Sequence, residues 1–194
     1  VSFNGAQLFS WSQPAEGRGH ELWLVRLEPS QGSELFRIHA GTGQLSEPRI
    51  TGSAAGLTLS WTGSSSRGMR TLWCQPLGRD GRPVGNARAL ERLDDNVIAH
   101  AVLPLGGERI AIARARQDGP TLVIELGVAG VGYMPMGTAP SGSSLALDLE
   151  TDSDGRINLR WTEIEPSSDG ALEPASPGRP RRVNAPRFHE GWGR

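Results

Sequence analysis

Oxygen-bearing side chains recur between residues 150 and 158, in a pattern that suits a hard cation. Glu150, Asp152 and Asp154 alternate along the chain, Gly155 follows them, and Asn158 stands at the ninth position of the segment. Ca²⁺ takes about six to eight oxygen ligands, and alternate residues of a tight loop can converge on one ion. The spacing therefore predicts a calcium site formed by Glu150, Asp152, Asp154 and Asn158. The open alternative is a solvated hairpin turn that the same aspartates help to shape.

Other residue types that carry chemistry are scattered along the chain. The histidines are His20, His39, His100 and His189, and none has a partner at metal-ligand spacing. The single cysteine, Cys74, excludes an internal disulfide and is interpreted as a small buried hydrophobe. No G-x-S-x-G motif marks a nucleophile elbow. The sequence therefore favours a protein without a catalytic site.

The elements that would position such residues are marked by a tryptophan period. Trp11 and Trp61 are 50 residues apart, each is followed twelve residues later by Trp23 or Trp73, and Trp161 lies 100 residues beyond Trp61. A fixed period marks a repeated supersecondary unit. We expect Trp11, Trp61 and Trp161 on the second strand of each unit and Trp23 and Trp73 on the third. Their indoles should fill the layer between neighbouring sheets, with a sugar-stacking platform as the functional alternative.

The units themselves read as strands joined by tight turns. The third copy is the clearest, with strands expected at 97–105, 108–115, 120–128 and within 131–138. Gly106-Gly107 and Asp118-Gly119 supply the positive φ that two-residue hairpin turns need. The fold class is therefore all-β, built from repeated four-stranded antiparallel units of about 50 residues. Such units form a β-propeller or part of one, and a β-sandwich or an open curved sheet is the alternative.

Three segments resemble known propeller repeats. Residues 56–90 place Trp61 on a strand, then a polar turn, Leu72-Trp73 on a strand, an Arg-Asp-Gly turn and a further strand. This order resembles the bacterial repeats of the TolB-type propellers. Residues 35–51 are similar to the outer hairpin of such a blade, and the 150–158 loop resembles the calcium loops of integrin-like propeller repeats. The resemblance implies a propeller fold and a binding or scaffolding role, in the periplasm, at the cell surface or secreted from a bacterium.

The composition of the chain argues against two kinds of partner, nucleic acids and the membrane interior. The chain has 194 residues, with 20 basic and 21 acidic residues and a formal net charge of −1, and every basic residue is arginine. A balanced charge argues against a nucleic-acid partner held by bulk charge. The apolar stretch 122–136 contains Glu125 and Pro135, which makes it a poor membrane span.

The last part of the chain differs from the repeats. We expect a β-repeat domain over 1–165 and a Pro/Arg-rich C-terminal tail over 166–194, which holds five prolines and five arginines. Such a composition buries too little surface to repay its ordering entropy. The tail is either a disordered or surface-bound terminus or a docking arm, or part of it (182–188) closes a ring. The docking residues would be two aromatic anchors and three polar contacts, namely Phe188, Trp192, Arg179, Arg181 and Arg182.

Together these features predict a non-enzymatic, extracytoplasmic domain that binds or scaffolds a protein partner or a surface. One alternative is a carbohydrate-active enzyme with carboxylates at the propeller axis. Another is an accessory subunit of a larger assembly, anchored by the C-terminal tail. Ca²⁺ is the one cofactor that the residues suggest.

Overall fold

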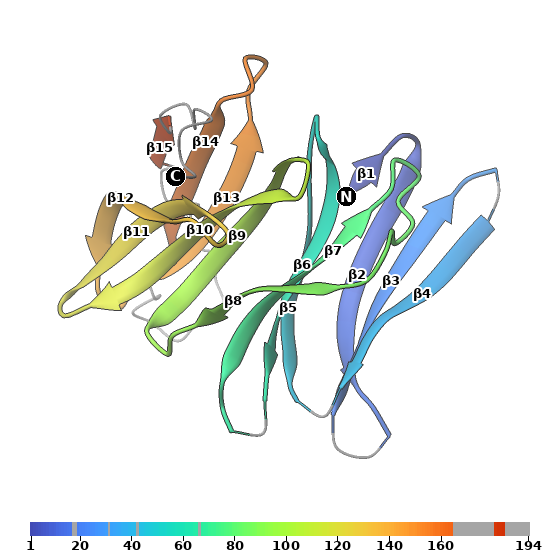
Figure 1. Ribbon diagram of the computed structural model, residues 1–194, viewed down its shortest axis with the longest axis horizontal. Helices are drawn as coiled ribbons and strands as arrows, with labels where there is room; N and C mark the ends of the chain where they lie inside the picture. The colour runs from blue at the N-terminus through green and yellow to red at the C-terminus, as the bar shows by residue number, and fades with distance from the viewer. Residues whose placement is uncertain (17–18, 31, 42, 66, 165–180, 185–194) are drawn as a thin grey trace, which may run out of the picture. The chain divides into compact units, whose positions relative to one another are not determined.

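The computed structural model of the chain is all-β (Figure 1). It describes residues 1–164 except 17–18, 31, 42 and 66, together with residues 181–184. In these ranges the regular structure consists of strands. No helix within them has the length and hydropathy needed to cross a membrane.

The strands form four antiparallel sheets in which chain neighbours are also sheet neighbours. The first sheet contains β1 (Ser2–Phe3), β2 (Ala6–Pro14), β3 (His20–Glu28) and β4 (Gly32–Gly41). The second contains β5 (Leu45–Ser53), β6 (Gly56–Ser64), β7 (Arg70–Leu77) and β8 (Arg88–Leu93). The third contains β9 (Val97–Gly106), β10 (Arg109–Asp118), β11 (Thr121–Val128) and β12 (Gly132–Pro140). The fourth contains β13 (Ser144–Thr151), β14 (Ile157–Ile164) and β15 (Arg181–Asn184).

The predicted class, all-β with four-stranded antiparallel units, is confirmed for the first three sheets, and none of the four described sheets closes on itself. The four strands expected in the third copy are present, with ends that shift by a few residues. The chain divides into two compact units. Unit 1 comprises Val1–Asp94 and Pro104–Glu108, and unit 2 comprises Asp95–Leu103 and Arg109–Arg194.

The 50-residue period is visible in the strand register. Trp11 lies opposite Trp23 across β2 and β3, and Trp61 lies opposite Trp73 across β6 and β7. In both sheets the register to the fourth strand shifts just before the third-strand tryptophan, between Leu22 and Trp23 and between Leu72 and Trp73. The placement of the tryptophans on second and third strands is therefore confirmed. Each sheet has a cross-strand tryptophan pair and a β-bulge at the same position, which identifies the two sheets as copies of one repeat.

The third sheet repeats this geometry with different residues. Its bulge lies between Ile124 and Glu125, which makes Glu125 the counterpart of Trp23 and Trp73. Arg114 lies opposite Glu125 on the second strand and so takes the place of the other tryptophan. The two form an ion pair, with 2.7 Å between Nε of Arg114 and Oε2 of Glu125. An ion pair thus replaces the tryptophan pair at the same point of the repeat.

In unit 1 the core lies between the first and second sheets. The first sheet contributes Leu8, Leu22 and Leu24, which alternate with outward-facing residues along β2 and β3. The second sheet contributes Leu57, Leu59, Trp61 and Leu77. Trp61 is fully buried, and its ring packs on His39 of β4 with 5.9 Å between the ring centroids. The tryptophan-bearing face of the second sheet is therefore covered by the leucine-bearing face of the sheet before it.

Unit 2 repeats this packing 100 residues later. Trp161 of β14 is 4% exposed and lies over β12 of the preceding sheet, at Gly137. A Cβ on Gly137 would lie 3.0 Å from Cη2 of Trp161, so the ring needs a residue without a side chain there. Gly137 pairs with Ile124 before the bulge, as His39 pairs with Leu22. Trp61 and Trp161 thus occupy equivalent places, as the sequence period predicts.

The prediction that all these indoles fill the layer between sheets is wrong for the two of the first sheet, namely Trp23 and its cross-strand neighbour Trp11. The side chain of Trp11 is 37% exposed, whereas Trp61 at the equivalent position is fully buried. The reason is that the second sheet has a sheet packed on its tryptophan face, and no described residue of unit 1 covers that face of the first sheet.

Candidate functional site

The exposed apolar residues of unit 1 gather on one face of the first sheet. Odd-numbered residues of β2 point to this side, since the strand alternates and its even-numbered residues Ala6 and Leu8 are buried. The face carries three aligned cross-strand sets, which are Gln7–Leu27–Ser33, Phe9–Val25–Leu35 and Trp11–Trp23–Arg37. We call the six apolar residues of these sets the outer face; they are Phe9, Trp11, Trp23, Val25, Leu27 and Leu35.

The outer face is open to solvent although most of its residues are large and apolar. Phe9 is 49% exposed, Leu35 is 56% exposed and Leu27 is 38% exposed. Their counterparts in the second sheet behave differently, because Leu59 is fully buried and Leu77 is 6% exposed. A contiguous exposed apolar patch on a folded protein marks an interaction surface.

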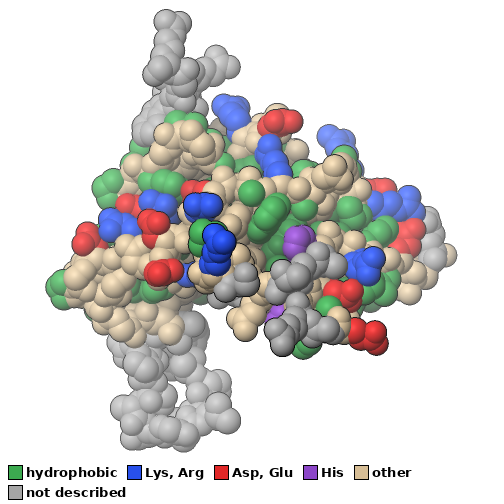
Figure 2. Space-filling model, turned by 60° about the horizontal axis from the view of Figure 1, so that its bottom comes forward, with side chains coloured by type: hydrophobic (Ala, Val, Ile, Leu, Met, Phe, Trp, Pro, Cys, Tyr) green, Lys and Arg blue, Asp and Glu red, His purple; other side chains and the backbone are tan. Residues whose placement is uncertain are grey.

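Polar groups border this face and fix its two indoles. Nε1 of Trp11 donates a hydrogen bond to Gln13, and Nε1 of Trp23 donates to Glu21, both at 3.2 Å. Glu21 also pairs with Arg37, with 3.3 Å between the charged atoms. The outer face therefore has an aromatic and aliphatic centre and a hydrogen-bonded polar rim, the anatomy of a protein interface. In the view of Figure 2, basic and acidic side chains are interspersed, in line with the balanced charge.

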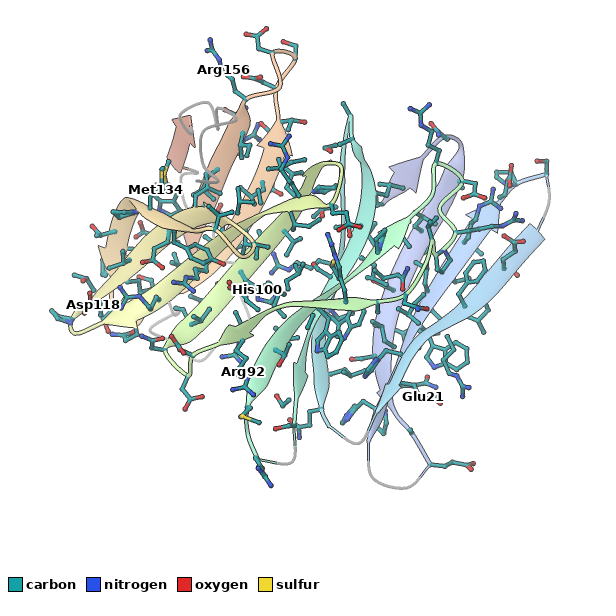
Figure 3. The ribbon with its side chains drawn as sticks, viewed as in Figure 1. Glu21, Arg92, His100, Asp118, Met134 and Arg156 are labelled. Carbon is teal, nitrogen blue, oxygen red and sulfur yellow. The ribbon has the colours of Figure 1, made fainter. Side chains whose placement is uncertain are left out.

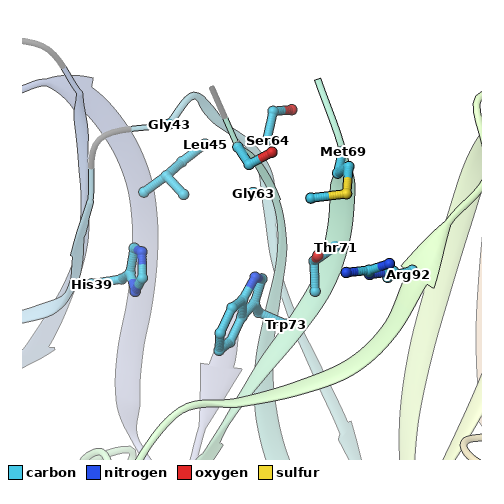
Figure 4. Close-up of a pocket in the computed structure, with 10 residues that line it drawn as sticks. His39, Gly43, Leu45, Gly63, Ser64, Met69, Thr71, Trp73 and Arg92 are labelled. Carbon is cyan, nitrogen blue, oxygen red and sulfur yellow. The ribbon is translucent and has the colours of Figure 1, made fainter. Parts of the chain in front are cut away.

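A pocket also opens in unit 1, between strands of the first and second sheets (Figure 4). Trp73 stands between His39 on one side and Thr71 and Arg92 on the other, and Leu45 lies above. The indole of Trp73 stacks on that of Trp61, with 6.4 Å between centroids and 9° between planes, and His39 lies 5.8 Å from Trp73. A flat aromatic wall beside a guanidinium can hold the apolar face of a ring-shaped ligand with a negative or polar edge.

The surroundings of His39 disfavour its charged form. Burial lowers the pKa of His39 below its ordinary value of 6.5, since the imidazolium would lose solvation beside the two indoles. The unfolded chain therefore binds a proton at His39 at a higher pH than the folded chain does.

We accordingly expect acid to destabilise unit 1 through His39. Stability falls as the pH drops below about 6.5, because the unfolded state takes up more protons there, and His39 has no such effect well above that pH. His39→Gln removes the titrating group, so its urea midpoint should fall less than that of the wild type between pH 8 and pH 5.5. Equal losses in the two proteins would contradict this assignment.

The predicted calcium ligands lie around the β13–β14 hairpin, near whose tip Arg156 is labelled in Figure 3. Oδ1 of Asp152 accepts hydrogen bonds from the backbone N–H groups of Asp154 and Arg156, at 2.9 and 2.8 Å. Glu150 pairs with Arg160 on the neighbouring strand. Asn158 lies directly opposite Glu150 and is fully buried.

Two of the four predicted ligands, Asp152 and Glu150, form contacts within the hairpin itself. Asp152 caps the turn through two backbone bonds, which is the role of an Asx turn. In the part of the chain that the structure describes, no three His, Cys, Asp or Glu side chains lie together as a metal site would need. Calcium binding by Glu150, Asp152, Asp154 and Asn158 stays a prediction.

The remaining sequence-predicted residues fall in different places. Arg181 and Arg182 lie on β15, which pairs with β14 through Trp161↔Arg181 and Arg160↔Arg182. This short strand belongs to the stretch assigned to the C-terminal tail. Arg179, Phe188 and Trp192 lie outside the described residues. Cys74 is fully buried, and burial raises the pKa of its thiol, as expected of a structural cysteine.

Sequence reasoning did not identify the outer face or the pocket. The alternation in Phe9-Ser-Trp11 and in Leu22-Trp23-Leu24 signals two apolar faces on the first sheet, but not which of them is covered. The pocket joins His39, Trp73 and Arg92 from three strands, and no short motif in the sequence encodes that meeting.

No protein-family model, curated protein or solved structure matches the chain.

Proposed function

We propose that the chain is a non-enzymatic binding or scaffolding domain that holds a protein partner on the outer face of its first sheet. The observation that carries this proposal is the exposure of Phe9, Trp11, Leu27 and Leu35 on one sheet face. Leaving such residues in water forgoes about 25 cal/mol for each Å² of apolar surface that could be buried. A partner that covers the face gains this free energy, and aromatic residues at the centre of a patch supply much of the affinity of protein interfaces.

The repeat supports this proposal independently of exposure. The equivalent face of the second sheet, with Leu59 and Trp61, is buried beneath the leucines of the first sheet. In unit 2, Trp161 is buried in the same way. In both of these repeats another sheet covers the tryptophan-bearing face. The outer face is the equivalent face of the first repeat, and a partner would cover it.

The pocket supports a second candidate function, the binding of a small ring-shaped ligand such as a sugar. The aromatic wall of Trp73 and His39 next to Arg92 favours it. A carbohydrate-active enzyme would need two carboxylates at the bound ring. The described lining of this pocket contains neither aspartate nor glutamate, so it suits a binding role better than glycoside hydrolysis.

Three further parts belong to the same proposal. The four meandering sheets are blades, or part of the blades, of a TolB-type or integrin-like propeller; their consecutive strand order and 50-residue period support this. The domain works outside the cytoplasm of a bacterium, in the periplasm, at the cell surface or as a secreted protein. It serves there as a scaffold or as an accessory subunit whose C-terminal tail anchors it to a larger assembly.

The test replaces two exposed residues of the outer face. In the variant Phe9→Ser with Leu35→Ser, the melting temperature should stay within a few degrees of the wild type, because surface changes cost about 0.5 kcal/mol or less. Binding of the partner recovered with the wild-type domain should weaken at least about tenfold, measured by titration of the purified pair.

The matched control is Val131→Ser with Ile98→Ser, since Val131 is 50% exposed and Ile98 is 43% exposed but both lie on other strands or turns. This control should bind like the wild type. Unchanged affinity in the outer-face variant, or equal loss in the control, would remove the outer face as the binding surface.

A further inference from the structure

The pocket of unit 1 lies where the neighbouring repeat carries two polar side chains. In the first sheet, Gln13 lies opposite Glu21 across β2 and β3. The equivalent pair of the second sheet is Gly63 and Thr71, and both of these residues line the pocket. A glycine and a threonine fill much less space than a glutamine and a glutamate. The pocket therefore occupies the space that the two longer side chains take in the first sheet.

In the first sheet the glutamate of this place connects an indole to a guanidinium. Oε2 of Glu21 accepts a hydrogen bond from Nε1 of Trp23 at 3.2 Å. Oε1 of the same carboxylate lies 3.3 Å from Nη1 of Arg37. Hydrogen bonds to an ionised group are stronger than those between neutral groups. One carboxylate thus satisfies two donors at this point of the repeat.

The third sheet also fills this place with a charged side chain. Arg116 follows Arg114 by two residues on β10, as Gly63 follows Trp61 on β6. The Arg116 guanidinium lies 3.6 Å from Glu125, which holds the position of the third-strand tryptophan. In the first three sheets a charged side chain therefore fills this place twice, and the second sheet has small residues there instead.

The second sheet has an indole N–H and a guanidinium at this place. Nε1 of Trp73 is directed at Gly63, where a Cβ atom would lie 3.4 Å from it, and no described residue accepts its hydrogen bond (Figure 4). Arg92 lies opposite Thr71 across β7 and β8, so its guanidinium borders the same pocket. The described lining contains neither aspartate nor glutamate. Two donors therefore face a pocket whose described residues supply no carboxylate.

We propose that this pocket binds a ring-shaped ligand that carries a carboxylate, such as a sugar acid or an aromatic acid. The carboxylate accepts the hydrogen bond of Trp73 and pairs with Arg92, and so does what Glu21 does in the first sheet. The ring lies beside the Trp73 indole, in a cavity of about 290 Å³ that has room for one such ring. The inference deepens the second candidate function, on which it rests, by naming the charged group of the ligand.

The test follows the indole N–H resonance of Trp73 in the full chain by NMR, identified by its loss in Trp73→Phe. Glucuronate is compared with glucose and benzoate with benzyl alcohol, because each pair exchanges a carboxylate for a hydroxymethyl group on the same ring. The titrations are made at pH 8, well above the pKa of His39, so that its charge plays no part. In at least one pair the acid should bind at least about tenfold more tightly than the alcohol.

The variant Arg92→Gln should abolish this preference for the acid, because it removes the cation that pairs with the carboxylate. The matched control is Arg79→Gln, which removes an exposed arginine of unit 1 that does not line the pocket and should bind like the wild type. The acid that binds more tightly, glucuronate or benzoate, identifies the source of the ring.

A second arm places the carboxylate in the protein itself. Thr71→Glu restores the residue type of the first sheet, so the Trp73 resonance should move as the introduced carboxylate titrates, and added acid should no longer bind. Thr71→Gln has the same size without the charge, and its Trp73 resonance should not titrate. This arm does not depend on how tightly a free ligand binds.

Each result decides a different part of the inference. Equal affinities for acids and alcohols would overturn the carboxylate and leave ring binding in this pocket standing. A preference that survives Arg92→Gln, or a Trp73 resonance that does not titrate in Thr71→Glu, would overturn the pair of donors as the site. A Trp73 resonance that none of the four compounds moves would overturn both the inference and the second candidate function. The outer-face proposal is untouched by any of these results.

Discussion

Replacing Trp61 with alanine should lower the free energy of unfolding by about 3–5 kcal/mol, the range observed when a large buried aromatic side chain is truncated and a cavity is left. Trp61 is fully buried between the two sheets of unit 1 and contacts both His39 and Trp73. Trp161→Ala should cost a similar amount in unit 2, because Trp161 is 4% exposed at the equivalent place. Both losses are read from urea unfolding followed by circular dichroism, which does not depend on tryptophan emission.

The matched control is Trp11→Ala, which changes the same residue type at the same position of the repeat. Trp11 is 37% exposed and its N–H bonds to an exposed glutamine, so its loss should cost no more than about 1 kcal/mol. Equal costs for Trp61 and Trp11 would mean that the outer face is covered in the folded chain and not open to solvent.

Glu125→Ala should destabilise unit 2 by about 2–3 kcal/mol, somewhat less than the ~3–5 kcal/mol for breaking a fully buried pair. The side chains of Arg114 and Glu125 are only 18% and 13% exposed. The substitution therefore removes this carboxylate from a guanidinium that is mostly buried. Arg114 keeps its contact with the Tyr133 ring, 3.7 Å from the centroid, which limits the loss. Urea unfolding of unit 2 measures the effect.

The double variant Arg114→Met with Glu125→Leu should recover part of that loss, because it removes both charges of this pair and fills the space with apolar groups. Arg116 also pairs with Glu125, at 3.6 Å, and keeps its ion pair with Asp118 in the variant. The exposed pair Arg160–Glu150 provides the comparison, since its side chains are 41% and 37% exposed and Glu150→Ala should cost about 1 kcal/mol or less. A double variant that is less stable than Glu125→Ala would contradict this explanation, because it would show that the loss of stability does not come from an uncompensated charge.

Much of the strand pattern could be predicted from the sequence, because a repeat shows its period directly. The offset between Trp11 and Trp61 corresponds to equal strand registers, and Trp23 and Trp73 lie on third strands as expected. In the third copy, Gly106-Gly107 and Asp118-Gly119 lie where β9 and β10 end and their turns begin. These features are local, and local periodicity reports the local backbone.

What could not be predicted depends on which faces meet. Trp11 and Trp61 have nearly the same sequence neighbours, yet only Trp61 has a sheet packed over it. Arg114 and Glu125 replace the tryptophan pair without any shared residue type, so only the bulge position reveals the equivalence. In the 150–158 loop, spacing alone could not show that Asp152 accepts two backbone N–H groups of its own turn.

The most direct test of the central claim is hydroxyl-radical footprinting of the chain, once purified and once inside its native cell. Trp61 should be unreactive in both, because it is buried. Phe9, Trp11 and Leu35 should be labelled in the purified chain and protected in the cell, where the partner covers the outer face, while Ile98 and Val131 should be labelled equally in both. Equal labelling of Phe9 and Leu35 in the two samples would contradict the claim that this face binds a partner.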